Sequence, residues 1–184
     1  MDFWLIVGAL FILCLYLLVE NIIHNRCIKN ISVRIHVNGT RGKSSVARLI
    51  AAGVRARTIA KTTGTLARYI DIDGSGTPVV RIGFSNIAEQ IRVVFKARRA
   101  KADAIIIECM ALQPLLQSLC ELKIVKATHG VLTNARPDHL DVMGPTERDV
   151  AKALAGTIPV NSKYFTAENI HLDFFEYACK DRNT

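Results

Sequence analysis

The stretch Gly39-Thr40-Arg41-Gly42-Lys43-Ser44-Ser45 joins two segments of different periodicity. Polar and apolar side chains alternate over residues 32–37, which predicts a β-strand. From Val46 to Val54 the apolar side chains recur at helical spacing. The order strand, glycine loop and helix places backbone N–H groups at a helix amino terminus, where anions bind favourably. The order therefore predicts an anion site at this loop.

The residue types within the loop narrow that anion to a nucleotide phosphate. Backbone N–H groups can surround a phosphate only where no side chain blocks them, which Gly39 and Gly42 allow. Lys43 can place its charge on the β- and γ-phosphates, and the Ser44 hydroxyl can bind Mg²⁺. Val37 replaces a further glycine of the common P-loop pattern, so the loop is a variant. The alternative is an ordinary strand-to-helix turn.

The composition favours a compact domain with anionic partners. The 184 residues are 50% hydrophobic and carry a formal net charge of +8. There is no arginine-rich tail and no regular interleaving of aromatic and basic residues, so nucleic acid is not expected as a partner. The five cysteines have no CxxC spacing, which argues against a zinc cage or a disulfide framework and favours a reducing compartment.

The amino-terminal segment predicts a membrane anchor. Residues 3–19 are apolar and uncharged, close to the length that spans a bilayer. Asp2 precedes this run and basic residues follow it, which places the rest of the chain in the cytoplasm. We expect a single-pass anchor at residues 1–23 and a basic linker at 24–31. A cleaved signal peptide and a buried core helix are the alternatives.

Residues 32–184 predict an α/β fold with a doubly wound, mostly parallel sheet, because strand and helix patterns alternate. A hairpin tip is expected at residues 73–76. After the glycine loop, strands are expected at 61–65, 104–107, 130–133 and 163–167, and helices near 87–95, after Thr146 and at 171–180.

Polar clusters follow several expected strands. Lys61-Thr62-Thr63-Gly64-Thr65 supplies hydroxyl groups, Glu108 ends a run of isoleucines, and residues 134–141 contain two aspartates and a histidine. Ligands bind at the carboxyl edge of such sheets. Each cluster has a simpler interpretation as a local turn or a solvated strand end, and Cys109 is expected to be a buried small side chain.

Taken together and in this order, the motifs resemble the central ATPase domain of the Mur ligase superfamily. The resemblance rests on the short loop without its first glycine, the threonine–glycine segment, Glu108 and residues 134–141. The poly-γ-glutamate synthase branch is the most similar, through the membrane segment and three further stretches. These stretches are Asn86-Ile87-Ala88-Glu89-Gln90, Glu108-Cys109-Met110-Ala111 and residues 138–146.

The resemblance implies an ATP-dependent amide ligase that joins glutamate units through γ-carboxylates by way of an acyl phosphate. ATP and Mg²⁺ are the implied cofactors. Lys43 and His139 are the implied catalytic residues, and Ser44, Glu108 and His139 the implied metal ligands. The implied nucleotide contacts are Gly39, Thr40, Arg41, Gly42, Lys43, Ser44, Ser45, Thr63, Thr65, Asn86 and Asn134.

The implied partners are a glutamate or poly-γ-glutamate substrate and other membrane subunits of a polymer synthase and export complex. Two features depart from the family. Leu154 stands where many Mur ligases have a carbamylated lysine, and residues 32–184 are expected to form an ATP-binding domain truncated at its carboxyl end. A membrane-anchored nucleotide-binding subunit or an inactive fragment without ligase chemistry is therefore one alternative. A folylpolyglutamate or peptidoglycan ligase is another.

Overall fold

The computed structural model describes residues 2–64, 66–81 and 86–184. In this part of the chain seven strands form one sheet in the order β4-β3-β2-β5-β1-β6-β7. Strands β2, β5, β1, β6 and β7 are parallel, and β3 and β4 form an antiparallel hairpin at one edge. The mostly parallel α/β sheet is confirmed. The strand bounds are β1 Val33–Asn38, β2 Thr58–Lys61, β3 Arg68–Ile70, β4 Gly76–Pro78, β5 Ala104–Glu108, β6 His129–Leu132 and β7 Lys163–Thr166.

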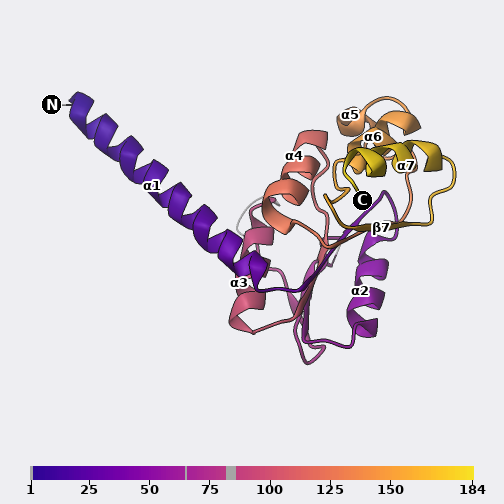
Figure 1. Ribbon diagram of the computed structural model, residues 1–184, viewed down its shortest axis with the longest axis horizontal. Helices are drawn as coiled ribbons and strands as arrows, with labels where there is room; N and C mark the ends of the chain where they lie inside the picture. Colours follow the sequence, from indigo (N-terminus) through magenta and orange to yellow (C-terminus); the bar gives the residue numbers. More distant parts are fainter. Residues whose placement is uncertain (1, 65, 82–85) are drawn as a thin grey trace.

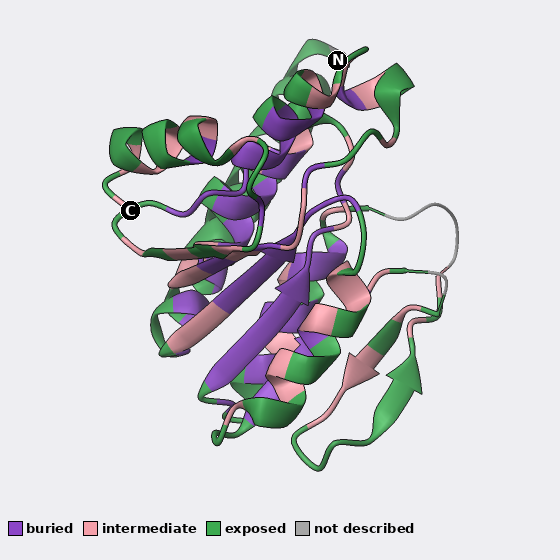
Figure 2. Cartoon of the chain, turned by 90° about the vertical axis from the view of Figure 1, so that its right-hand side faces the viewer, coloured by how far each residue is buried: buried purple, intermediate pink, exposed green. Residues whose placement is uncertain are grey.

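Helices cover both faces of the sheet, as doubly wound topology requires. Ile106 of β5 packs on one face with α2 (Lys43–Gly53). Ile105 and Ile107 point to the other face, where they pack with α3 (Glu89–Arg99) and a π-helical turn, η1 (Cys120–Val125). Successive side chains of β5 therefore point to opposite faces of the sheet, and each face is covered by a different helix. Figure 2 shows the central strands almost wholly buried and the β3–β4 hairpin largely exposed.

A third cluster forms beyond strand β6. Leu132 packs there with helices α6 (Glu147–Ala155) and α7 (Leu172–Asp181), and a short helix, α5 (Leu140–Met143), precedes them. The Thr146 hydroxyl caps α6 by accepting a hydrogen bond from the backbone N–H of Asp149. The expected helices after Thr146 and at 171–180 are confirmed.

The amino-terminal helix α1 (Asp2–Lys29) projects away from the domain (Figure 1). Apolar side chains from Phe3 to Val19 are exposed, and α1 is the one helix in the described residues that is long and apolar enough to cross a membrane. The helix continues through Lys29, so most of the segment 24–31, expected as a linker, is helical. Its last turns are held by burial of Cys27 and Ile28 against the core.

The segment between β5 and β6 contains structure that the sequence did not indicate. It forms α4 (Pro114–Leu119), which continues into η1. The strand expected at 61–65 ends earlier, at Lys61, so the threonines after it lie on a loop. This loop reaches the carboxyl edge of the sheet, where β1 and β5 also end.

Candidate nucleotide-binding site

The glycine loop connects β1 to α2 with backbone angles that only glycine adopts easily. Gly39 has φ 134°, and a Cβ there would lie 2.1 Å from the Thr133 hydroxyl oxygen. Gly42 has φ 82° and forms the amino cap of α2. The two glycines therefore serve different purposes. Gly39 permits close approach to the neighbouring strand end, and Gly42 permits the turn into the helix.

The Asn134 side chain clamps this loop. Its Oδ1 accepts hydrogen bonds from the Thr40 hydroxyl at 2.6 Å and from the Arg41 backbone N–H at 3.1 Å. Its Nδ2 donates to the Arg41 carbonyl at 3.1 Å. The amide is therefore engaged with the loop itself, and the structure places Asn134 as a support of the loop. Its expected contact with nucleotide stays a prediction.

The Lys43 side chain folds back over the loop. Its Nζ donates to the carbonyl of Gly39 at 2.6 Å and to that of Thr40 at 3.2 Å. Burial lowers the pKa of Lys43, and the nearby Glu108 carboxylate opposes that shift. A partly buried ammonium held by neutral carbonyls is suited to an anionic ligand, because a phosphate would supply the counter-charge that carbonyls lack.

Ser44 and Glu108 form the second half of the site. The Ser44 hydroxyl contacts the two carboxylate oxygens of Glu108 at 3.0 and 2.8 Å, and the backbone N–H of Thr63 donates to Oε2 at 2.7 Å. Glu108 is buried, and Gln90 donates to its backbone carbonyl at 3.1 Å. The end of β5 is therefore held from both sides.

The donor set at Ser44 and Glu108 fits Mg²⁺. This cation takes few protein oxygens and completes its shell with water and phosphate, so a hydroxyl next to a carboxylate suffices. Within residues 2–64, 66–81 and 86–184 there is no cluster of three or more histidine, cysteine or acidic side chains that could hold a metal. The pair therefore fits a metal shared with a nucleotide rather than a closed protein cage.

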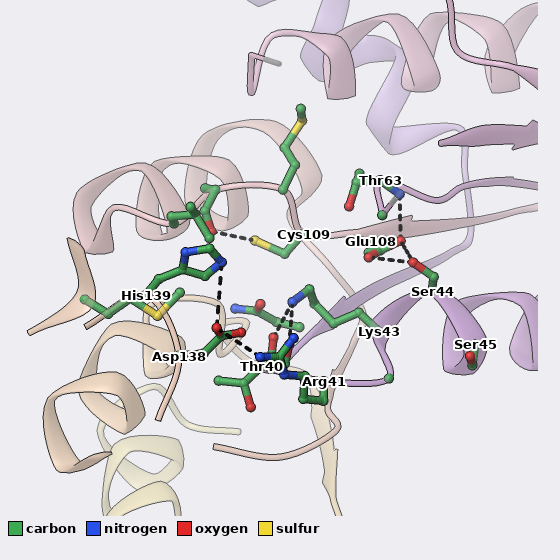
Figure 3. A pocket seen from close by; sticks show the side chains of 18 of the residues that line it. Thr40, Arg41, Lys43, Ser44, Ser45, Thr63, Glu108, Cys109, Asp138 and His139 are labelled. Atoms are coloured by element: carbon green, nitrogen blue, oxygen red, sulfur yellow. Dashed lines mark hydrogen bonds and ion pairs between the residues drawn. The ribbon is translucent and has the colours of Figure 1, made fainter. Parts of the chain in front are cut away.

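Asp138 and His139 occupy the opposite side of the cavity (Figure 3). Asp138 Oδ1 lies 3.3 Å from Nη2 of Arg41 and 3.9 Å from Nε2 of His139. Lys43 lies between this group and Glu108 in the view. His139 therefore contacts Asp138 in this structure, and its expected role at a second Mg²⁺ stays a prediction.

One cavity of about 560 Å³ collects most of the expected residues. Asn86 lies outside it. Its side chain accepts a hydrogen bond from the Ala88 N–H at 2.9 Å at the start of α3, and it lines a smaller cavity. Thr65 lies outside the described residues. The expected residues that line the larger cavity are Gly39, Thr40, Arg41, Gly42, Lys43, Ser44, Ser45, Thr63, Glu108 and His139.

Two features of the site were not predicted from the sequence. Arg81, which belongs to no motif, lines the cavity. Asn38, at the end of β1, donates to Gln117 at 2.8 Å and Thr157 at 3.0 Å beneath the loop. All three side chains are buried. Contacts this distant in sequence leave no local pattern, so no sequence signal pointed to them.

A glycine loop at a strand–helix junction, with a partly buried lysine and a serine–carboxylate pair, defines a phosphate-loop α/β domain. The chain belongs to the Mur ligase family, since residues 37–156 match the Mur ligase middle domain. It is 42% identical over 177 residues to "Capsule biosynthesis protein CapB" of Bacillus anthracis. This match covers 94% of this chain and 38% of the relative. It is 37% identical over 188 residues to "PGA synthase CapB" of Bacillus subtilis (strain 168), covering 98% and 47%.

These matches confirm the resemblance to the poly-γ-glutamate synthase branch, and the chain spans less than half the length of either relative. Solved structures support the fold. The chain is similar to E. coli FolC in complex with ADP, with a TM-score of 0.68 and 18% identity, covering 88% of this chain and 43% of FolC. A folylpolyglutamate synthase/dihydrofolate synthase with Mn, AMPPNP and L-glutamate bound gives 0.67 at 15% identity, covering 89% and 45%.

Proposed function

We propose that this chain is the ATP-binding part of an amide ligase that joins glutamate units through their γ-carboxylates, for poly-γ-glutamate or capsule synthesis. The observation that carries the proposal is the Ser44–Glu108 pair together with the partly buried Lys43 in one cavity. Membership of the Mur ligase family supports the ligase class. The relatives named for capsule biosynthesis and PGA synthesis support the polymer.

The cavity residues suit phosphoryl transfer followed by amide formation. Lys43 holds positive charge where the γ-phosphoryl group would move, and Thr63 lines the same cavity. Ser44 and Glu108 would hold Mg²⁺, which when bound neutralises charge on the phosphates. A glutamate carboxylate oxygen bonds to the γ-phosphorus, whose bond to the bridging oxygen breaks, and ADP leaves with that electron pair. The amine of a second glutamate then attacks the acyl carbon, and phosphate leaves.

The chain would work at the membrane surface. Helix α1 supplies the single-pass anchor, and the basic residues Arg26 and Lys29 at its end would hold the domain on the cytoplasmic side. Other membrane subunits of a synthase and export complex would extend the polymer across the bilayer. The net charge of +8 favours the anionic product.

Nucleotide binding is tested by titrating the full chain with ATP, with and without Mg²⁺. Lys43→Ala removes a charged hydrogen-bond donor worth about 1.5–3 kcal/mol, so affinity should fall roughly 10- to 100-fold. Lys152→Ala is the matched control, because Lys152 is exposed on α6 and pairs with Asp149 of the same helix. Equal affinities of wild type and Lys43→Ala contradict the proposal.

Ligase chemistry is tested in the complete synthase assembly, by measuring ATP hydrolysis as a function of glutamate concentration. The proposal predicts hydrolysis that depends on glutamate and that Lys43→Ala abolishes. Nucleotide binding without any glutamate-dependent hydrolysis contradicts the ligase. That result supports the alternative function, a membrane-anchored nucleotide-binding subunit.

A further inference from the structure

A second, smaller cavity lies next to the phosphate-loop cavity. It has a volume of about 230 Å³, and its described lining residues come from β3, from residues 79–81 after β4, and from the segment that leads into α3 with the first turn of that helix. Arg81 lines both cavities. Arg81 would therefore connect a ligand in the smaller cavity to the cavity in which the nucleotide phosphates are expected.

The smaller cavity contains more positive than negative charge. Glu89 is the one acidic residue among its described lining residues, and it serves two cations. Its Oε1 lies 2.8 Å from Nε of Arg81, and its Oε2 lies 2.8 Å from Nζ of the fully buried Lys61. Arg92 adds a third cation and forms no ion pair within the described residues. The described lining thus holds two cations and one carboxylate, and the buried Lys61 adds a further charge from outside the lining, so the net charge is positive.

The carboxylates in and near the smaller cavity, Glu89 and Asp71, already form ion pairs. Burial alone would raise the pKa of Glu89, but hydrogen bonds from Arg81 and Lys61 outweigh it and lower this pKa to about 2. Glu89 is therefore fully ionised and shared. The nearby Asp71 pairs with Lys96 at 2.8 Å, and Lys96 also lies 5.0 Å from the centre of the Tyr69 ring. That pair is neutral as a unit and leaves Arg92 without a counter-charge.

The walls also fit the size and character of one amino-acid unit. Tyr69 and Val79 provide apolar surface, and Arg81 and Arg92 add two guanidinium groups to the same lining. A guanidinium presents two parallel N–H donors that match a carboxylate. A short apolar stem carrying a carboxylate is the chemistry that such a lining recognises.

We propose that this cavity binds a carboxylate of the acceptor glutamate chain, with Arg92 and Arg81 as its guanidinium contacts. The inference rests on the proposed function. A glutamate unit carries an α-carboxylate close to its γ-carboxylate, so the first can be held in the smaller cavity while the second enters the phosphate-loop cavity past Arg81. Arg81 and Arg92 thereby select an anionic acceptor and position it.

The inference is tested by calorimetric titration of the full chain, held in detergent micelles, in a buffer that contains Mg²⁺ and the ATP analogue AMPPCP. The probes are a γ-linked tetraglutamate and the same oligomer with its free carboxyl groups converted to amides. The acidic oligomer should bind and the neutral one should not. Arg92→Gln should weaken binding of the acidic oligomer about 10-fold or more, whereas Arg92→Lys should retain part of it.

Arg92 is the better position for substitution, because it is exposed and Arg81 supports the buried Glu89. Arg98→Gln removes the same charge from the exposed face of α3, outside the smaller cavity, and is the matched control. AMPPCP affinity should be equal in wild type, Arg92→Gln and Arg98→Gln.

The outcomes separate this inference from the proposed function. A wild-type chain that binds AMPPCP but not the acidic oligomer overturns the inference alone. Equal binding of the two oligomers, or equal loss in Arg92→Gln and Arg98→Gln, also overturns it. Failure of wild type to bind AMPPCP contradicts the proposed function itself.

Discussion

The hydroxyl oxygen of Ser44 lies 2.8 Å from Oε2 of Glu108, although 64 positions separate the two residues in sequence. The contact joins the first turn of α2 to the carboxyl end of β5. It forms because β1 and β5 are parallel neighbours, so the loop after one strand meets the end of the other. A carboxylate and a hydroxyl thus share one point of the cavity.

Replacing Glu108 by glutamine tests that point. The amide keeps the size of the side chain but loses the charge that a divalent cation requires. We expect Mg²⁺ to strengthen ATP binding in wild type and to have at least about 10-fold less effect in Glu108→Gln. Asp173→Asn, on the exposed surface of α7, should behave as wild type. Isothermal titration with and without Mg²⁺ measures both, and an unchanged Mg²⁺ effect in Glu108→Gln contradicts the assignment.

The glycine loop gives a prediction about stability. Gly39→Ala places a Cβ 2.1 Å from the Thr133 hydroxyl oxygen at a backbone angle that alanine disfavours, so the free energy of unfolding should fall by about 1–3 kcal/mol. Gly42→Ala has open space around its Cβ and should cost only the backbone strain, about 1 kcal/mol.

Gly53→Ala is the control for both, because Gly53 ends α2 and nothing lies within 4 Å of a Cβ there. It should be neutral or stabilising by up to about 1 kcal/mol, since alanine favours helices. Denaturant unfolding of all three variants gives the order. Equal stability of Gly39→Ala and Gly53→Ala contradicts the role of Gly39.

The sequence was informative where local patterns carry the chemistry. The glycine loop, the strand that ends at Glu108 and the start of a helix after Thr146 are each indicated by a few adjacent residues. The structure brings Glu108 into the same cavity as the loop because parallel strands end at one edge. Order along the chain was therefore enough to predict which clusters meet.

Prediction from the sequence failed where a contact joins residues that are distant along the chain. Residues 24–29 have a polar, basic sequence, which predicts a linker. Their buried side chains, such as Ile28, pack against residues distant in sequence, and the local pattern does not show these contacts. Arg81 lies in no motif, and its partner Glu89 belongs to the stretch of residues 86–90, whose sequence does not indicate an ion pair. Contacts between distant residues produce no periodicity or spacing in the sequence, so local patterns do not predict them.

The buried pair of His36 and Glu121 predicts a dependence of stability on pH. Nδ1 of His36 lies 2.7 Å from Oε2 of Glu121, and both side chains are buried. Burial alone would lower the pKa of His36, but the neighbouring thiols of Cys109 and Cys120 and the Glu121 carboxylate raise it well above its ordinary value of 6.5. A folded pKa above the unfolded one stabilises the protein fully below pH 6.5 and progressively less as pH rises through the folded value.

The free energy of unfolding should therefore fall as the pH is raised from 6.5. Glu121→Gln keeps an oxygen for the Ala127 N–H, which donates to Oε1 at 2.7 Å, but removes the charge that favours the imidazolium. The variant should be less stable below pH 6.5 and should show a flatter slope above it. Urea unfolding over this pH range measures the slope, and identical slopes in wild type and Glu121→Gln contradict the prediction.

The buried ion pair of Lys61 and Glu89 gives a further prediction. Glu89→Gln leaves the fully buried ammonium of Lys61 without its anionic partner, which should cost about 3–5 kcal/mol of unfolding free energy. The double variant Lys61→Met/Glu89→Gln should recover part of that loss, because no unpaired charge remains at Lys61. Glu176→Gln, exposed on α7, is the control and should be neutral. A single variant as stable as this control contradicts the prediction.

The buried end of α1 determines how the anchor can be removed. His24 Nε2 contacts the Ile124 carbonyl at 2.8 Å, and Cys27 and Ile28 are buried in the core beside α3. Residues 3–23 make no such contribution, because the apolar side chains of this segment are exposed. The boundary between anchor and domain therefore lies within one continuous helix, just before His24.

Two deletions test this boundary. Removal of residues 2–23 should release the protein from membranes into the soluble fraction while the domain keeps its cooperative unfolding transition. Removal of residues 2–29 takes away Cys27 and Ile28 as well, and burying such side chains contributes about 1.5–3 kcal/mol for the larger one. That shorter protein should unfold at lower denaturant or fail to fold. Membrane fractionation and urea unfolding measure the two effects. A 2–23 deletion that stays on membranes contradicts the anchor, and equal stability of the two deletions contradicts the structural role of the helix end.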